Sequence, residues 1–150
     1  MREISLVKPY PMSRELEEGL VEKLDFAKLA KVAATGRDVL PVVVQNADTG
    51  AVLTMAYANR EALERTLKDR VAVFWSTSRD ELWIKGATSG DYLDIVDVRV
   101  NCEQNSLLYL VRPRKAGVCH TKDADGKTRL TCYYRSLGAS GELGFVEERK

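Results

Sequence analysis

The sequence predicts one α+β domain with a core of antiparallel strands and a few helices, mainly in the N-terminal half. Two observations favour this class. β-rich runs follow one another closely through residues 39–112, separated by turn-forming stretches such as 86–91. Helical apolar periodicity is confined to the residues before position 70. A third observation excludes an alternative, because the order of elements lacks the strand–helix–strand alternation of a dinucleotide-binding sheet.

Length and composition agree with a single globular domain spanning 1–150. The chain has 150 residues, of which 45% are hydrophobic and 30% charged. A net charge of +1 argues against a nucleic-acid partner, which normally requires a clustered basic excess. The sequence shows no signal-peptide run and no stretch near the ~18 apolar residues of a membrane span. These features predict a cytoplasmic protein without a membrane partner.

The first part of the chain is expected to form an arm followed by one or two helices. Residues 1–12 contain two prolines and no helical period, which predicts an extended N-terminal arm. Four apolar residues then share one helical face, namely Leu16, Leu20, Val21 and Leu24. A second stripe covers 26–33, with Asp25 as a plausible N-cap and Gly36 as the end of the region.

The middle of the chain is expected to contain one hairpin, one short helix and further strands. Residues 39–58 contain two β-rich runs around a loop at 47–50, where Gly50 tolerates a positive φ. Asn59 is a good N-cap for a short helix over 59–70. Further β-rich runs stand at 71–77, 81–85, 92–100 and 106–112, and a last one at 130–137 follows a charged loop.

The three cysteines are candidates for a metal site. An odd number of cysteines in a reducing compartment makes disulfides improbable. Catalytic zinc typically takes three protein ligands, and Cys102, Cys119 and Cys132 supply that number. Their separations of 17 and 13 residues fit no small zinc module, so buried apolar cysteines remain the alternative. The single histidine, His120, is a fourth ligand, a general base or an ordinary surface residue.

Residues 74–90 have the composition of a phosphate-binding segment. They combine both tryptophans with hydroxyls, glycines and two cationic side chains, which are the groups that hold phosphate. A β-hairpin with buried aromatic residues and a hydroxyl-rich turn explains the same composition. The substrate-binding candidates are Trp75, Ser76, Arg79, Lys85, Thr88, Ser89 and Gly90.

A second, weaker metal pattern surrounds the first cysteine. Asn101, Glu103 and Asn105 alternate around Cys102, so on an extended backbone their side chains would point the same way. Such oxygens suit a hard cation such as Mg²⁺. Only Glu103 is charged, so the affinity should be modest, and a solvated strand end is the equal alternative.

Taken together, residues 39–137 resemble phosphoribosyl-AMP cyclohydrolase, in family order and over roughly two thirds of the chain. The motifs that carry the resemblance are FWSTSRDELWIKGATSG, VDVRVNCEQNSLLYLV, GVCHT and TCYYRSL. The resemblance implies an α+β enzyme that forms an intertwined homodimer. It also implies zinc held at the subunit boundary by cysteines matching Cys102, Cys119 and Cys132, a magnesium requirement, and His120 as the proton-transfer residue.

Three positions depart from the family pattern. The family's Asp-Cys-Asp-x-Asp magnesium motif is replaced over residues 101–105, where two carboxylates have become amides. Ala87 stands where the family has a glutamate, and the gap between Cys119 and Cys132 is lengthened by KDADGKTRL. We therefore expect zinc chemistry to be retained and Mg²⁺ to bind weakly or not at all.

The reaction implied is zinc-dependent hydrolysis of the N1–C6 bond of the adenine ring of phosphoribosyl-AMP, a step of histidine biosynthesis. Zinc can lower the pKa of water to about 7, and a histidine of pKa about 6.5 suits the proton transfer. Two alternatives stay open. One is a paralogous zinc hydrolase acting on another purine-like nucleotide, and the other is a nonenzymatic zinc-stabilised dimer that binds nucleotides.

Overall fold

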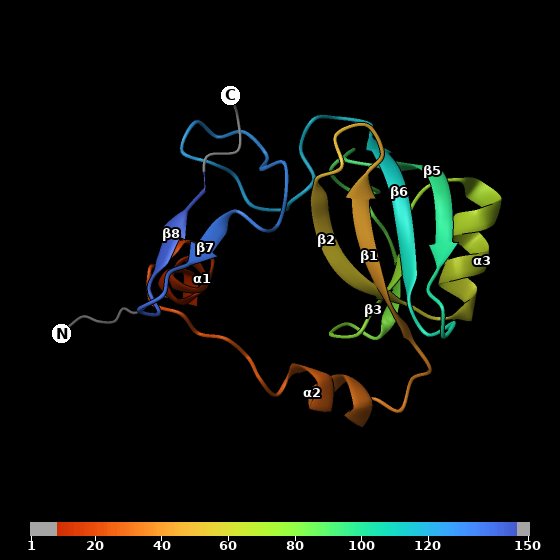
Figure 1. The fold of residues 1–150 in the computed structure, drawn as a ribbon, viewed down its shortest axis with the longest axis horizontal. Coiled ribbons are helices and arrows are strands. Elements are labelled where there is room, and N and C mark those ends of the chain that lie inside the picture. The colour runs from red at the N-terminus through yellow and green to blue at the C-terminus, as the bar shows by residue number, and fades with distance from the viewer. Residues whose placement is uncertain (1–8, 147–150) are drawn as a thin grey trace. The chain divides into compact units, whose positions relative to one another are not determined.

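The computed structural model describes residues 9–146, with side chains from residue 13 onward. This part of the chain divides into two compact units (Figure 1). One unit comprises residues 27–133, and the other combines the segment up to residue 26 with the segment from residue 134. The single domain predicted over 1–150 stays a prediction. No helix within residues 9–146 is long and apolar enough to cross a membrane.

The larger unit is built on a four-stranded sheet with the order β2-β1-β6-β5. Its strands are β1 (Leu40–Asn46), β2 (Val52–Ala58), β5 (Leu93–Val100) and β6 (Leu107–Pro113). The outer pairs, β1–β2 and β5–β6, are antiparallel hairpins, and the first of them was predicted as a hairpin. The α+β class and the predominance of antiparallel pairing are thereby confirmed.

The central pair of this sheet adds one parallel pairing to the predicted antiparallel core. Strands β1 and β6 run parallel, with Val42 opposite Leu107 and Asn46 opposite Val111 (Figure 1). Parallel neighbours need a crossover of about a dozen residues or more. The connection from β1 to β6 runs through residues 47–106, which include β2, β5 and the segment 59–92 between the two hairpins. Hairpin signals are local, so they could not show how the two hairpins dock against each other.

The β1–β2 hairpin forms where the sequence predicted it, because its loop supplies its own hydrogen bonds. The Asn46 side-chain oxygen accepts from the backbone N–H groups of Asp48 and Thr49, at 2.8 and 3.0 Å. Gly50 has a φ of 80°, a conformation that glycine adopts at low cost. The backbone N–H of Gly50 donates to the Asn46 carbonyl oxygen and closes the turn.

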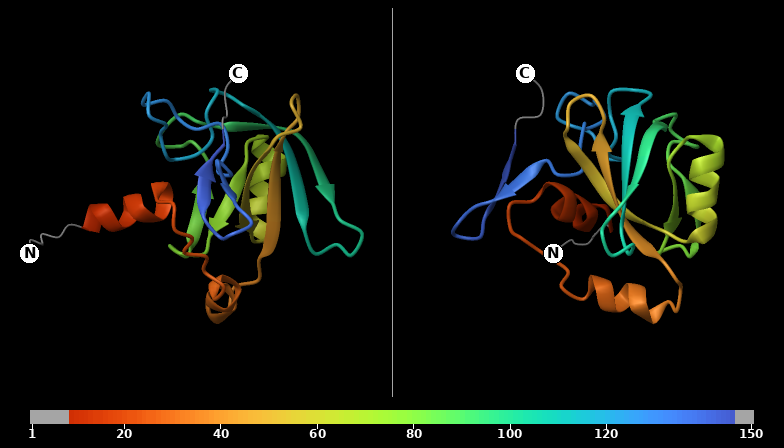
Figure 2. Two further views of the ribbon diagram at one scale, coloured as in Figure 1. Left: turned by 60° about the vertical axis from the view of Figure 1, so that its left-hand side comes forward. Right: turned by 45° about the vertical axis from the view of Figure 1, so that its right-hand side comes forward.

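Helix α3 (Arg60–Asp69) is confirmed, including its N-cap. The Asn59 side chain accepts from the backbone N–H of Ala62 at 2.8 Å, which satisfies one of the unpaired donors at a helix start. The buried Thr66 hydroxyl accepts from the N–H of Val73 at 3.0 Å and so ties the helix to the next strand. The helix lies beside β3 (Figure 2).

A second hairpin, β3 (Val73–Ser76) with β4 (Glu81–Ile84), contributes the aromatic part of the core. Phe74 is fully buried between two rings, 5.4 Å from the centroid of Trp83 and 5.8 Å from that of Tyr109. Tyr109 comes from β6, so this stack joins the hairpin to the four-stranded sheet. The remainder of the core consists mostly of valines and other aliphatic residues from the sheet.

The smaller unit contains one helix and one hairpin. Its elements are α1 (Pro9–Glu18), β7 (Arg135–Leu137) and β8 (Leu143–Phe145). The strand predicted over 130–137 is therefore restricted to its last three residues, and its partner β8 was not predicted. Tyr134 stacks on Phe145 with ring centroids 6.1 Å apart.

The boundaries of α1 correct two predictions. The helix begins at Pro9, so residues 9–12 of the predicted arm are helical, whereas residues 1–8 lie outside the described chain. It ends at Glu18 instead of continuing to Leu24. Proline is well tolerated in the first helical turn. The end is fixed by the C-terminal hairpin, because Arg135 donates to the carbonyl oxygens of Leu16 and Gly19, each at 2.8 Å.

Helix α2 (Lys28–Ala34) is shorter than predicted, and its apolar stripe is largely uncovered. It follows Ala27, with no side-chain cap, so Asp25 is not its N-cap. Only Val32 is buried, while the side chain of Leu29 is 69% exposed. Apolar spacing predicted the helix but not what would pack against it.

Candidate active site

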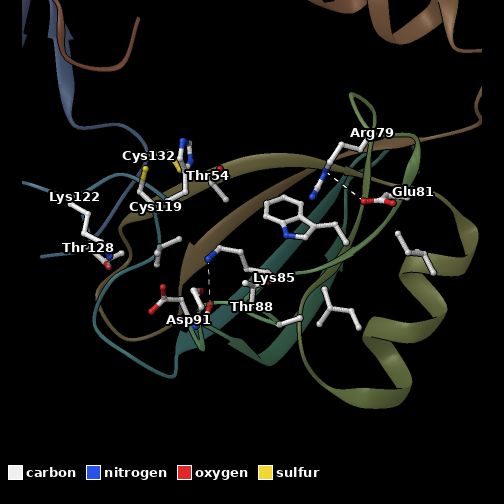
Figure 3. Close-up of a pocket in the computed structure, with 18 of the residues that line it drawn as sticks. Thr54, Arg79, Glu81, Lys85, Thr88, Asp91, Cys119, Lys122, Thr128 and Cys132 are labelled. Atoms are coloured by element: carbon white, nitrogen blue, oxygen red, sulfur yellow. Dashed lines mark hydrogen bonds and ion pairs between the residues drawn. The ribbon is translucent and has the colours of Figure 1, made fainter. Parts of the chain in front are cut away.

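A pocket of about 530 Å³ lies in the larger unit (Figure 3). Its walls come from β4 and the following turn, from Thr54 on β2, and from the loop around residues 118–132. Three sets of predicted residues meet there. They are the phosphate-binding candidates Arg79, Lys85, Thr88 and Ser89, the cysteines Cys119 and Cys132, and His120.

Backbone contacts hold the two pocket cysteines in place. The N–H of Cys132 donates to the carbonyl oxygen of Leu53 at 2.8 Å, and the Thr131 hydroxyl donates to the carbonyl oxygen of Val52 at the same distance. Cys132 is thus fixed to the edge of β2. The N–H of Cys119 donates to the Arg129 carbonyl oxygen at 3.0 Å, so Cys119 is fixed to the loop itself.

The two thiols interact directly. A hydrogen bond with Cys132, supported by Thr121, lowers the pKa of Cys119 to about 5, although partial burial opposes the shift. The same hydrogen bond raises the pKa of Cys132. The Thr121 hydroxyl lies 3.1 Å from the Cys119 sulfur. The pair therefore favours one thiolate, which is the form of cysteine that ligates metals.

Cys102 is not part of this cluster. It is exposed, lies in the turn between β5 and β6, and does not line the pocket. No group of three or more His, Cys, Asp or Glu side chains able to hold a metal occurs within residues 13–146. Within one chain the structure brings together two of the three predicted zinc ligands.

The residues of the altered magnesium motif form a hydrogen-bonded turn. The Asn101 side-chain N–H donates to the side-chain oxygen of Asn105 at 2.7 Å, and the Asn101 oxygen accepts from the backbone N–H groups of Asn105 and Ser106. Gln104 has a φ of 57°, so this stretch is not extended. The predicted alternation on an extended strand is therefore wrong, although Glu103 still contacts Asn105 at 3.4 Å. The side-chain amides of Asn101 and Asn105 stabilise this turn through their hydrogen bonds.

Some residues of the aromatic segment 74–90 line the pocket, and others lie outside it. Trp75, Ser76 and Gly90 are not among the residues that line the pocket. The Ser76 hydroxyl instead accepts from the backbone N–H and the guanidinium of Arg79, at 3.2 and 3.3 Å. Arg79 also lies 3.7 Å from the Glu81 carboxylate and 5.9 Å from the Trp83 ring centroid. Ser76 thus helps to position a pocket residue.

Lys85 is a largely buried cation in the pocket. Its amine donates to the Asp91 carbonyl oxygen at 3.4 Å (Figure 3). Desolvation lowers the pKa of Lys85, while the charges of Asp91 and the two thiols oppose this shift. The following Gly86 has a φ of 93°, and a Cβ there would collide with the backbone of Tyr92. Glycine is thus required for the turn that carries Thr88 and Ser89.

Several pocket residues were not predicted from the sequence. Glu81 and Asp91 flank the predicted phosphate segment, so extending it at each end would have found them. Lys122 and Thr128 belong to the lengthened segment between the cysteines. The unusual length was visible, but the sequence gave no sign that this segment would face the pocket.

Comparison with known proteins decides the family. The profile described as phosphoribosyl-AMP cyclohydrolase matches residues 54–134, which is more than half of the 150 residues. The chain belongs to the phosphoribosyl-AMP cyclohydrolase family. The matched region contains all three cysteines, His120 and the whole pocket.

Curated relatives agree with this membership. The phosphoribosyl-AMP cyclohydrolase of Chloroherpeton thalassium is 37% identical over 77% of this chain and 78% of its own length. That of Caulobacter vibrioides is 40% identical over 83% of this chain and 82% of its own length. The histidine biosynthesis bifunctional protein HisIE of Thermus thermophilus is 44% identical over 79% of this chain. This chain spans about half, 52%, of that bifunctional relative.

Proposed function

We propose that this chain is a zinc-dependent enzyme that hydrolyses the N1–C6 bond of the adenine ring of phosphoribosyl-AMP, a step of histidine biosynthesis. The observation that carries the proposal is the paired thiols of Cys119 and Cys132 in a pocket that also contains Arg79 and Lys85. Such a pocket combines metal ligands with phosphate-binding cations. Relatives named phosphoribosyl-AMP cyclohydrolase support the choice of substrate.

The donor set fits zinc. Cys119 and Cys132 are neighbours in space, one of them has a lowered pKa, and their sulfurs are soft ligands that zinc accepts. A catalytic zinc site needs a third protein ligand. Cys102 is the remaining cysteine and is exposed. Zinc held there would supply a Lewis acid that activates water at neutral pH.

A second copy of the chain would provide the third ligand. Cys102 follows the edge strand β5, whose Val96 and Val100 side chains are exposed. Apolar side chains on an exposed strand edge are typical of a surface that pairs with another chain. We therefore propose a homodimer in which Cys102 of one copy joins Cys119 and Cys132 of the other.

The residues of the pocket have different roles in the reaction. Substitution at N1 makes C6 of the adenine ring electrophilic, so the oxygen of water adds to C6 and the N1–C6 bond then breaks. His120 takes a proton from the attacking water and returns it to N1, which balances the hydrolysis. Arg79, Lys85, Thr88 and Ser89 hold phosphate through charge and hydrogen bonding. Magnesium has no assigned step, because the motif residues 101–105 are engaged in their own turn.

One observation favours a second candidate, a hydrolase acting on another purine-like nucleotide. Ala87 lines the pocket at the position where the family pattern has glutamate. Loss of that carboxylate removes a hydrogen-bond acceptor and a negative charge from the site. A substrate with a different polar edge would be accommodated by such a change.

The deciding experiment is a ring-opening assay with phosphoribosyl-AMP, followed by ultraviolet absorbance, on the zinc-loaded protein. We expect turnover by the wild type and a loss of about 100-fold or more in kcat for His120→Asn, since general acid–base catalysis contributes at least that much. Zinc content should stay unchanged in this variant. A zinc-loaded wild type without turnover contradicts the substrate assignment and directs the search to other purine nucleotides.

A further inference from the structure

The lengthened segment between the pocket cysteines is a structured hairpin. Lys122 and Thr128 form a β-bridge, and the N–H of Asp123 donates to the Lys127 carbonyl oxygen at 2.8 Å. The Asp123 carboxylate accepts from the backbone N–H groups of Asp125 and Lys127, both at 2.9 Å. These bonds fix the conformation of the tip. Residues 121–129 are called the cysteine-loop hairpin below.

The base of the cysteine-loop hairpin is fixed to the pocket wall. The Arg129 carbonyl oxygen accepts from the N–H groups of Val118 and Cys119, at 2.9 and 3.0 Å. The buried Arg129 guanidinium also donates to the Thr121 hydroxyl at 3.0 Å. Because both ends are anchored next to Cys119, the hairpin holds its side chains in a defined position relative to the thiols.

Lys122 presents an available charge at the pocket rim. Its amine donates to the Thr128 hydroxyl at 3.0 Å, and both residues line the pocket. An ammonium group has three donors, so two remain for a ligand. Within residues 13–146, no carboxylate forms an ion pair with Lys122. The Arg79 charge, in contrast, is shared with Glu81.

Lys122 and Arg79 stand at opposite ends of the pocket. Figure 3 shows Lys122 and Thr128 on one side, Arg79 on the other, and Lys85 between them. The pocket volume of about 530 Å³ is that of a site for a small molecule and not for a single anion. Two separated cations along one such pocket match a ligand with an anionic group at each end.

We propose that Lys122, together with the Thr128 hydroxyl, forms a second phosphate subsite, so that the pocket holds both phosphate groups of one ligand at once. The inference deepens the proposed function and rests on it, since phosphoribosyl-AMP carries one phosphate on each of its two ribose groups. Arg79 binds one of these phosphates and Lys122 the other. The cysteine-loop hairpin is thereby a specificity element for bisphosphorylated nucleotides.

The test compares Lys122→Ala and Lys122→Arg with the matched control Lys127→Ala. Lys127 lies on the same hairpin, is exposed and does not line the pocket. Kinetics are measured with phosphoribosyl-AMP and with its two mono-dephosphorylated forms. We expect Lys122→Ala to raise KM for the full substrate about tenfold, because one exposed charged contact with the substrate is lost. The value of kcat should change little. Lys122→Arg should recover most of this loss, and Lys127→Ala should match the wild type.

The dephosphorylated substrates separate binding from structural damage. The effect of Lys122→Ala should disappear with one mono-dephosphorylated form and persist with the other, because only one phosphate contacts Lys122. An equal effect on both forms, or no difference from Lys127→Ala, overturns the inference. Calorimetric titration of the same ligands gives the same comparison without turnover. A wild type that binds but does not turn over contradicts the proposed reaction and leaves the subsite comparison intact.

Discussion

Cys119 and Cys132, which are 13 residues apart in the sequence, lie side by side on the wall of the pocket (Figure 3), where each thiol shifts the pKa of the other. The hairpin between them closes on itself, so the length of the intervening segment does not separate them. Cys102, in contrast, lies in the β5–β6 turn and outside the pocket. This division of the three cysteines is the basis for the first two predictions.

Zinc should be bound at about one ion per chain, which metal analysis of the purified protein can measure. Cys102→Ser, Cys119→Ser and Cys132→Ser should each lose both zinc and ring-opening activity, because serine removes a thiolate ligand with little change in volume. The exposed Lys127→Ala variant is a suitable control and should keep its metal. Full zinc occupancy in all three serine variants would contradict the assignment of these cysteines as zinc ligands.

Subunit complementation tests whether the ligands are divided between two copies. Cys102→Ser and Cys132→Ser are each expected to be inactive, but a heterodimer of the two contains one intact ligand set. Equal mixing, unfolding and refolding should restore about one quarter of the wild-type activity, because half of the dimers are mixed and each has one good site.

The matched control for complementation is a mixture of Cys119→Ser with Cys132→Ser. Both changes damage the same half of the ligand set, so every site in this mixture lacks a ligand. We expect no recovery there. Equal recovery in the two mixtures, or a fully active monomer by light scattering, would show that the proposed sharing is wrong.

Magnesium dependence should be weak in the wild type and should return when the family's acids are restored. Asn101→Asp, Glu103→Asp and Asn105→Asp together provide three carboxylates for a hard cation. They also replace the hydrogen bond between Asn101 and Asn105, at 2.7 Å, by a contact between like charges. In Mg²⁺-free buffer, with zinc kept bound, we therefore expect a lower Tm than that of the wild type, and recovery of Tm as Mg²⁺ is added.

The comparison for magnesium is the wild type under the same conditions. Its Tm and activity should change little between zinc-loaded protein in Mg²⁺-free buffer and the same protein in millimolar Mg²⁺. Saturable activation of the wild type at low micromolar Mg²⁺ would contradict our account of residues 101–105.

The smaller unit should depend on the contact between Arg135 and the end of α1. Arg135→Ala removes two hydrogen bonds to the carbonyl oxygens of Leu16 and Gly19. We expect a loss of about 1–2 kcal/mol in the local stability of α1, measured by hydrogen exchange of its amides. The control is Arg14→Ala, which removes an exposed ion pair with Glu18 and leaves Arg135 in place. Equal exchange in the two variants would exclude the capping role.

The sequence by itself determined the elements whose hydrogen bonds are local. The β1–β2 turn is closed by Asn46 and Gly50, and α3 begins at Asn59, all within a few residues of the groups they bind. Composition likewise predicted most strands, because β-branched and aromatic residues that cluster between turn residues favour an extended backbone. The ordered motifs of residues 39–137 were sufficient to indicate the family, which the comparisons confirm.

The tertiary structure decided the features that depend on distant residues. The end of α1 is set by Arg135, which is 119 residues from Leu16, so apolar spacing overestimated the length of that helix. The parallel pairing of β1 with β6 depends on how two hairpins dock, and no local signal records it. The position of Lys122 opposite Arg79 follows from the anchoring of the cysteine-loop hairpin by Arg129 and Thr121. In each case the deciding contact joins segments whose proximity exists only in the folded chain.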